Sequence, residues 1–497
     1  MRPLVWFRSD LRTADNTALF QACRQASRGV VAAFVVSPAE WRSHDLAPAR
    51  VDLMLRTLRE LSSSLGKLNI PLLVLRAANA SDVASLILKA AHQHQCDALF
   101  YNREYEIDEA RRDAATTTMM ERAGIAVHAF TDQVVVAPGQ VRTGEGRFFT
   151  IFTPFKKAWI AAYDRDGGVP VLPTPRSQPA FAAQASAIPT EVPEFTSTID
   201  PAMWPAGEAH ALSLLERFAS DRILGYKANR DQPALDATST LSPYLAIGAL
   251  SPRQCVARAM QANRDTGRIR NGDSPLDTGH PGITQWITEL IWREFYTHIV
   301  HGFPRVCLGR AFKPATDSIP WSHDQEHFRA WTEGRTGVPI VDAAMRQLHA
   351  RGWMHNRLRM IVAMYLTKDL FIDWRWGERY FMRHLIDGYF ASNNGGWQWS
   401  ASTGTDAAPY FRIFNPISQS RANDPEGTFI RRYLPELAHL DNDAIHDPSS
   451  LPPLVRSGLN YPDPIVDHRR ARERVMAAFA ALKEPAGAPV ASRRRVP

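Results

Sequence analysis

The segment with the most chemical information runs from Asp387 to Trp399 and reads DGYFASNNGGWQW. Its paired asparagines and paired glycines favour tight backbone turns, and glycine lets the main chain approach a flat ligand closely. Because these residues stand between an acid and two tryptophans, the segment indicates a planar heterocycle held by amide groups. The alternative is an ordinary loop with buried tryptophans.

Two other segments place polar and aromatic residues together at helical spacing. In 286–295, WITELIWREF, the apolar residues have the spacing of one helix face. The adjoining stripe holds Trp286, Glu289, Trp292 and Arg293, and a second stripe in 353–360 holds Asn356, Arg359 and Met360. Tryptophan, asparagine, methionine and glutamate together are a poor composition for a water-facing helix. A pocket is therefore favoured over a solvated face.

The elements that must position these residues fall into two classes. Short apolar runs at 4–7, 30–36, 72–75, 98–101 and 126–130 alternate with helical periodicity, which predicts buried parallel strands in a doubly wound α/β domain. No G-x-G-x-x-G or Walker-type loop accompanies them, so no dinucleotide or ATP site is expected there. After about residue 206 the pattern is helical.

The length of 497 residues predicts more than one domain. We expect an α/β domain at 1–135, a proline-rich interdomain linker at 136–205, a helical domain at 206–480 and a flexible basic tail at 481–497. The hydrophobic content of 45% and charged content of 22% are typical of a globular chain.

Charge and cysteine usage set further expectations. A formal net charge of +7 permits binding to a polyanion without proving it. The four cysteines lie far apart without a C-x-x-C pair, so neither a zinc site nor a disulfide framework is expected, and no metal is predicted. No apolar stretch is long enough to span a bilayer, and the N-terminus has no apolar core of a secretory signal. We expect an intracellular protein.

A specific resemblance joins these observations. Residues 393–399 (NNGGWQW) and 402–416 (STGTDAAPYFRIFNP) resemble the sequence pattern of the photolyase/cryptochrome family. Further matches are WFR at 6–8, DLR at 10–12, FTPF at 152–155, LSPYL at 241–245 and WREF at 292–295. The likeness extends to about residue 475 and is greatest to the class I members that act on cyclobutane pyrimidine dimers.

The resemblance implies an N-terminal α/β domain and an all-helical domain that binds FAD. The residues implied for its phosphates are Tyr226, Thr238, Ser239, Leu241 and Ser242, and those implied around its isoalloxazine ring are Trp286, Arg293, Asn356, Arg359, Asp387 and Asn393. Asn393 would stand opposite flavin N5, and Arg359, oriented by Asp387, would favour a negatively charged reduced ring. Tyr389 departs from the pattern, because many relatives have a second acid there.

The implied reaction is light-driven repair of cyclobutane pyrimidine dimers by electron transfer from excited reduced FAD to a dimer flipped out of DNA. Glu289 resembles the acid that stabilises the dimer radical anion. The residues implied to contact the dimer or the DNA are Arg230, Glu289, Trp292, Asn356, Arg357, Met360 and Trp399. Trp321, Trp374 and Trp397 match the tryptophan chain that refills an oxidised flavin by electron hopping, although core packing would also explain them.

A second, light-harvesting chromophore would contact His44 and Glu109. Methenyltetrahydrofolate is the first expectation and a deazaflavin the second, although Asp108 and Leu308 replace the usual Asn and Lys. The expected partner is DNA containing pyrimidine dimers, met by a monomer in the cytoplasm, at the nucleoid, with no membrane association.

Two other functions remain open at this point. A cryptochrome-type blue-light receptor would keep the flavin without repair, but plant cryptochromes typically carry an acid at the position of Asn393. A sequence-independent DNA-binding module would require a vestigial flavin pocket. Met360 further separates this chain from enzymes of the (6-4) lesion, which have a histidine-centred pocket there, although His355 is adjacent.

Overall fold

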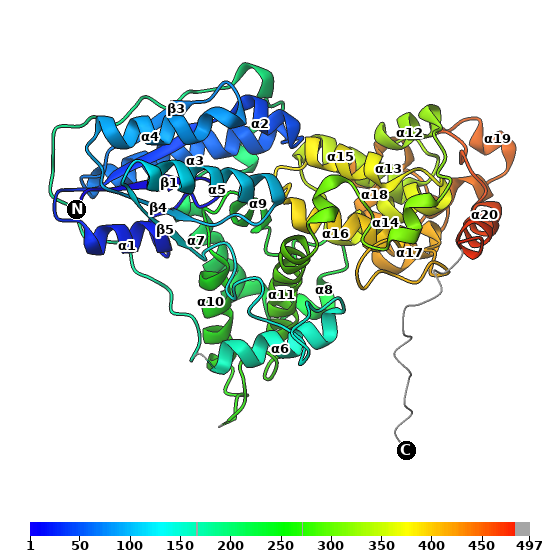
Figure 1. Cartoon of the computed structure of the whole chain (residues 1–497). Coiled ribbons are helices and arrows are strands. Elements are labelled where there is room, and N and C mark those ends of the chain that lie inside the picture. Colours follow the sequence, from blue (N-terminus) through cyan, green and yellow to red (C-terminus); the bar gives the residue numbers. More distant parts are fainter. Residues whose placement is uncertain (166, 271, 483–497) are drawn as a thin grey trace.

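The computed structural model describes residues 1–165, 167–270 and 272–482. Apart from its first two residues, the predicted basic tail lies outside the described residues. Figure 1 shows an α/β part at the N-terminal end of the chain and a larger, mainly helical part that follows it. The two predicted fold classes are therefore confirmed, whereas the exact domain limits remain a prediction.

The α/β part is built on one parallel sheet in the order β3-β2-β1-β4-β5. The strands are β1 (Pro3–Phe7), β2 (Val31–Val36), β3 (Leu72–Arg76), β4 (Ala98–Asn102) and β5 (Ala126–Phe130). Central strands β1 and β4 are buried along their whole length. Strands covered on both faces have continuous apolar runs, and the partly buried edge strand β5 has an apolar run interrupted only by His128, so all five could be predicted.

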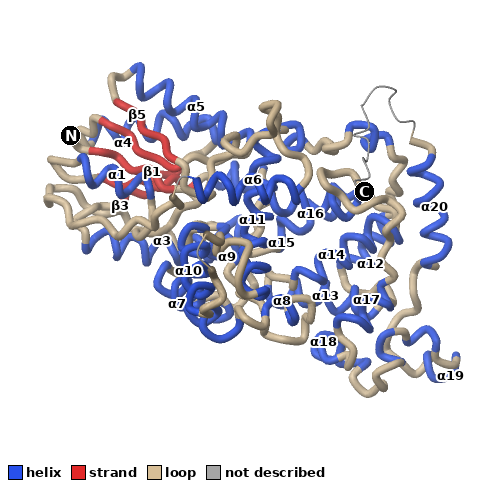
Figure 2. The backbone as a smooth tube through the Cα atoms, turned by 90° about the horizontal axis from the view of Figure 1, so that it is seen from below, coloured by secondary structure: helices blue, strands red, loops and turns tan. Residues whose placement is uncertain are grey.

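Helices cover both faces of the sheet, as Figure 2 shows. Val5 and Phe7 pack with residues of α1 (Thr17–Gln25) and α3 (Pro48–Lys67), whereas Leu4 and Trp6 pack with α4 (Val83–Gln93) and α5 (Ile107–Arg122). The alternation of side chains along a strand produces these two separate cores. The short helix α2 (Pro38–Ser43) follows β2 at the carboxyl edge of the sheet.

The remainder of the described chain is largely helical. Its helices are α6 (Phe152–Arg165), α7 (Glu208–Arg217), α8 (Tyr226–Asn229), α9 (Ser242–Ala246), α10 (Pro252–Asp265), α11 (Pro281–Gly302), α12 (Gln325–Thr332), α13 (Pro339–Arg351), α14 (Asn356–Met364), α15 (Trp374–His384), α16 (Phe390–Ala401), α17 (Pro416–Asn423), α18 (Thr428–Tyr433), α19 (Pro453–Arg456) and α20 (His468–Ala480). Among the described helices, none combines the length and hydropathy that a membrane crossing requires.

The predicted linker at 136–205 contains a helix that its prolines did not suggest. This helix, α6, packs against α11 of the helical part. The Asp406 carboxylate accepts a hydrogen bond of 3.1 Å from the Phe152 amide at the first residue of α6. Two of the recognised motifs, at 152–155 and 402–416, therefore meet in space, although Phe152 and Asp406 are 254 positions apart in the sequence.

Buried charges join the two parts of the molecule. The Arg253 side chain donates to Asp15 and to Asp132, at 2.7 Å from the latter, and Arg12 also pairs with Asp132. Arg253 belongs to α10, whereas its acidic partners belong to the α/β part. Because all these side chains are almost fully buried, the two parts are held by a specific polar network.

The prediction of tight turns at residues 393–396 is wrong, because these residues lie within α16. The reason for Gly395 is packing between helices. A Cβ atom at Gly395 would lie 2.1 Å from the Tyr296 ring of α11, so only glycine allows α16 to approach α11 this closely. Gly396 has no neighbour within 4 Å of a hypothetical Cβ atom.

Candidate functional site

Three helices bring the predicted residues into one region. Helix α16, which carries Asn393, packs against both α11, which carries Glu289, and α14, which carries Met360 (Figure 1). Asn393 and Trp397 are four residues apart and share one side of α16. Positions far apart in the sequence therefore converge on one part of the helical half.

The acid on α11 is held by two polar neighbours. Glu289 forms an ion pair with Arg230, which follows α8, and accepts a hydrogen bond of 2.7 Å from Gln285 one turn earlier. All three side chains are only partly buried, so they remain open to a ligand. The structure thus joins two predicted DNA-contacting residues, Arg230 and Glu289, and adds Gln285.

The Trp292 ring has one face covered by protein. Phe152 of α6 stacks on it with a centroid distance of 3.6 Å and an interplanar angle of 6°. Tyr296 lies on another side at 5.6 Å. Because Asp406 caps α6 at Phe152, the orientation of Trp292 depends on the motif at 402–416. Sequence patterns did not reveal this support, since stacking partners in different segments leave no periodic signal.

Helix α14 begins with a histidine that acts as a cap. His355 Nδ1 accepts a hydrogen bond of 3.2 Å from the Arg357 amide, and burial lowers the pKa of His355 to about 4. His355 is therefore neutral at physiological pH. The Arg357 guanidinium pairs with Asp231 at 2.8 Å. Asn356, the first residue of the helix, is exposed.

A second ion pair lies between α14 and the segment before α16. Arg359 donates two hydrogen bonds from one nitrogen to the buried Asp387 carboxylate, at 2.8 and 3.0 Å, and a third to the Met354 carbonyl at 2.8 Å. Asp387 therefore fixes the orientation of the guanidinium, as predicted from the sequence. The pair as a whole carries no net charge, and the fixed guanidinium can donate further hydrogen bonds to an acceptor atom of a ligand.

A residue that the sequence reasoning missed supports Asn393. Its Nδ2 donates to the Glu378 main-chain carbonyl at 2.9 Å, and the Glu378 carboxyl accepts from Asn394 Nδ2 at 2.8 Å. Burial raises the pKa of Glu378 to about 7, so this carboxyl is neutral in part at physiological pH. Gln398 donates in turn to Asn394 at 2.8 Å. Amide–carboxyl contacts between helices α15 and α16 thus fix the paired asparagines.

The predicted phosphate-binding segment borders a cavity of about 490 Å³. Thr238, Thr240 and Trp353 line it together with several basic residues, which are Arg217, Arg222, Arg351 and Arg432. Ser242 accepts a hydrogen bond of 3.3 Å from Trp353 Nε1. Hydroxyl groups surrounded by arginines suit a diphosphate, which is the observation that tests the fit of FAD.

Other predicted flavin neighbours pack among themselves. Tyr226 and Trp286 are buried and both contact the Phe218 ring, while Leu241 is fully buried and Ser239 partly so. Arg293 donates to the Gln133 carbonyl at 2.7 Å and lies 4.4 Å from the centre of the Tyr389 ring. The Tyr389 hydroxyl in turn lies 2.8 Å from that of Thr297.

The tryptophans predicted to carry electrons belong to one hydrophobic cluster. Trp321, Trp374 and Trp397 are all buried within it. A Cβ atom at Gly377 would lie 2.1 Å from Trp397, so this glycine lets α15 pass close to the indole ring. Trp399 is partly exposed on the neighbouring side of α16.

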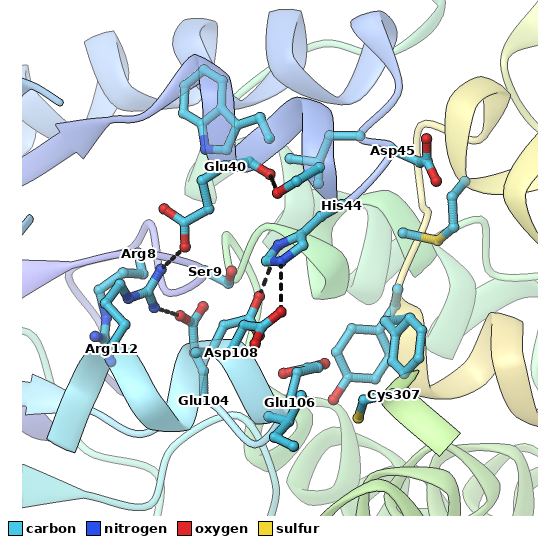
Figure 3. Close-up of a pocket in the computed structure, with 18 of the residues that line it drawn as sticks. Arg8, Ser9, Glu40, His44, Asp45, Glu104, Glu106, Asp108, Arg112 and Cys307 are labelled. Atoms are coloured by element: carbon cyan, nitrogen blue, oxygen red, sulfur yellow. Dashed lines mark hydrogen bonds and ion pairs between the residues drawn. The ribbon is translucent and has the colours of Figure 1, made fainter. Parts of the chain in front are cut away.

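The predicted antenna residues line a separate cavity of about 360 Å³ between the two parts of the molecule (Figure 3). His44 Nδ1 lies 3.2 Å from the Glu109 carboxylate and its Nε2 3.6 Å from Asp108. Arg112, which also lines the pocket, pairs with Glu40 at 2.7 Å. Cys307 lines the cavity from the helical half.

The charge state of His44 decides what this cavity can hold. The hydrogen bond that His44 donates to Glu109, partly opposed by burial, raises the pKa of His44 to about 9. The Glu40, His44 and Glu109 side chains are close enough to surround a metal ion. A protonated imidazole offers no lone pair to a metal, however, and it favours a ligand that accepts hydrogen bonds.

Two family descriptions match this sequence. Residues 3–178 match "DNA photolyase", and residues 286–481 match "FAD binding domain of DNA photolyase". Together they span both the sheet and the helices that carry Glu289, Arg359 and Asn393.

Individual relatives cover almost the whole chain. The chain is 44% identical to the deoxyribodipyrimidine photo-lyase of Salmonella typhimurium over 97% of this chain and 99% of the relative, and equally identical to that of Vibrio cholerae over the same shares. Among solved structures, a bacterial class III photolyase from Agrobacterium tumefaciens is 34% identical with a TM-score of 0.82, covering 97% of each chain.

Proposed function

This chain belongs to the DNA photolyase family and repairs pyrimidine dimers, and from that premise we propose which of its side chains carry the reaction. The observation that carries the proposal is the convergence of two ion pairs, Arg230–Glu289 and Arg359–Asp387, with Asn393 on adjoining helices. Such an arrangement offers an acid, a fixed cation and a neutral amide within one region.

The FAD-binding domain would hold its cofactor between the phosphate segment and the α14–α16 pair. The hydroxyl groups of Thr238, Ser239 and Ser242 would donate hydrogen bonds to the phosphates, next to the arginine-rich cavity. Arg359, Asp387 and Asn393 would border the flavin ring. Tyr226 and Leu241 would also contact the phosphates. Trp286, Arg293 and Asn356 would also contact the flavin ring. Bound FAD supplies one-electron transfer chemistry after absorbing light.

The dimer would bind against α11 and α14. Glu289 would form a hydrogen bond with the reduced dimer, while Trp292 and Trp399 would stack on its bases. Phe152 holds the Trp292 ring in place, which lowers the entropy lost on stacking. Asn356 and Met360 would complete the floor, and Arg230 and Arg357 would approach the phosphates.

Trp397, Trp374 and Trp321 would return electrons to an oxidised flavin. Support comes from their burial in one cluster and from the place of Trp397 on the same helix face as Asn393. Burial protects oxidised indole rings from side reactions with water.

The cavity around His44 and Glu109 would hold the antenna, with methenyltetrahydrofolate favoured over a deazaflavin. The charged imidazole of His44 would face an acceptor atom of the pterin. Leu308, which is 58% exposed, stands where relatives have a lysine, so the acidic tail of a folate loses one cation. We expect Leu308→Lys to raise the folate retained on purification, measured by absorbance relative to FAD, and no effect would favour the deazaflavin.

The cellular setting completes the proposal. The protein would act as a monomer in the cytoplasm, at the nucleoid, where its DNA substrate is found. All four cysteines are unpaired thiols, which suits a reducing compartment.

The deciding experiment is loss of dimers from a defined oligonucleotide under near-ultraviolet light, with the same mixture kept in the dark as control. We expect repair only in the light. Binding to the oligonucleotide without light-dependent repair would exclude the proposed roles and favour a blue-light receptor.

A further inference from the structure

A set of aromatic rings leads away from Trp397 toward a histidine at the surface. Trp397 and Trp331 are 6.1 Å apart between ring centroids, at an interplanar angle of 74°. Trp331 and Tyr380 follow at 5.6 Å and 64°. The Tyr380 hydroxyl lies 2.6 Å from His349 Nε2. Trp331 is fully buried, Tyr380 is partly buried and His349 is exposed.

We propose that Trp331, Tyr380 and His349 form a second route by which positive charge leaves Trp397, ending in proton transfer from the Tyr380 phenol to His349. The inference rests on the proposed photoreduction through Trp397. None of these three residues was among the predicted site residues, and their order follows from ring contacts and one hydrogen bond.

The Trp331 indole is suited to pass charge onward without losing its proton. Its Nε1 donates to the Val362 carbonyl at 3.2 Å within the core. A main-chain carbonyl is too weak a base to accept a proton from an oxidised indole. Trp331 therefore stays a radical cation, which can take an electron from Tyr380.

Tyr380 differs because its partner is a base. Burial and the charge of Glu333 raise the pKa of Tyr380, so the phenol is protonated before oxidation. Burial and the neighbouring His384 lower the pKa of His349, so its imidazole is neutral and able to accept. Both groups are already within hydrogen-bond reach, as proton transfer requires.

The step balances in electrons and protons. One electron leaves Tyr380 and passes through Trp331 and Trp397 to the light-excited oxidised flavin, which is the oxidant. The phenolic O–H bond breaks, and an N–H bond forms at His349 Nε2. The products on the protein are a neutral tyrosyl radical and an imidazolium that faces solvent.

The test is electron paramagnetic resonance of the FAD-loaded protein, with oxidised flavin, during illumination. We expect a neutral tyrosyl radical, which is lost in Tyr380→Phe and in Trp331→Phe. In His349→Gln, which keeps a polar group but removes the base, the signal should fall severalfold. Tyr433→Phe is the matched control, because Tyr433 lies in the same half and contacts Phe429 rather than Trp331.

Four results would overturn the inference. A tyrosyl signal that persists in Tyr380→Phe, or that is unchanged in Trp331→Phe, would place the radical elsewhere. Photoreduction of the flavin without any tyrosyl signal would overturn this route alone. Absence of photoreduction would overturn both this route and the proposed role of Trp397.

Discussion

Glu289 is already held by Arg230 and Gln285 before any substrate binds. We predict that Glu289→Ala lowers the repair yield per absorbed photon severalfold and leaves DNA affinity within about twofold, because in the proposed role the acid acts on the reduced dimer and not on the phosphates. Repair yield under limiting light and binding to a dimer-containing oligonucleotide measure the two effects. Equal losses of yield and affinity would contradict this role.

His44 predicts a dependence of stability on pH. Its pKa is raised from 6.5 to about 9, chiefly by the hydrogen bond with Glu109. The raised value means that the stabilisation is complete below about pH 6.5 and is lost as pH rises through about 9. For this partly exposed pair we expect a contribution of roughly 2 kcal/mol to the free energy of unfolding.

The comparison of wild type with His44→Gln, both without antenna, isolates this effect. The wild-type melting temperature should fall relative to that of the variant between pH 7 and 9.5. If the melting temperatures of the two proteins changed in parallel with pH, the His44–Glu109 pair would contribute nothing to stability.

Side-chain contacts were predictable from sequence only where a motif carried them. The Arg359–Asp387 pair was anticipated and is present. Glu378 and Phe152 were not, because their partners lie on other elements and no spacing rule connects them. Contacts that depend on how helices meet become visible only in three dimensions.

At the scale of elements, α16 contains two adjacent glycines, of which Gly395 is packed tightly against a neighbouring helix and Gly396 is not. We predict that Gly395→Ala destabilises the protein by several kcal/mol, because the new methyl group would overlap Tyr296 unless α16 moves away from α11. Gly396→Ala is the matched control. Its Cβ atom meets nothing within 4 Å, and we expect a gain of about 0.5–1 kcal/mol from helix propensity.

Thermal unfolding of the apo-proteins measures both changes, and flavin retention reports any displacement of Asn393. If the two alanine variants behaved alike, backbone entropy and not packing would explain the glycines.

Elements were predicted well where local pattern and tertiary surroundings agree. The central parallel strands are largely apolar because helices cover both faces, and the predicted limits of all five strands were close to those observed. Helix α16 was misread, since paired asparagine and glycine favour turns in isolation. Its helical state is imposed by α11, α14 and α15, which no local rule represents.

At the scale of the whole molecule, Asp132 holds the two parts together. Burial alone would raise its pKa, but Arg12 and Arg253 lower it to about 2. We predict that Asp132→Ala lowers the free energy of unfolding by about 3–5 kcal/mol, because two buried guanidinium groups lose their partner. Denaturant unfolding at neutral pH measures this change.

Glu216→Ala provides the comparison, because Glu216 pairs with Arg258 at 2.7 Å on the surface. Loss of this surface ion pair should lower the free energy of unfolding by less than about 1 kcal/mol. Similar losses in both variants would argue against a buried interdomain network.

Helix α6 affects where this protein can be recombined with its relatives. Although it precedes the main helical part in the sequence, its Phe152 supports Trp292, and its first amide is bound by Asp406. Chimaeras that exchange the N-terminal half should keep α6 with its native C-terminal partner. A crossover before Phe152 preserves that pairing, whereas one after Arg165 brings a foreign helix against Trp292, the residue proposed to stack on the substrate.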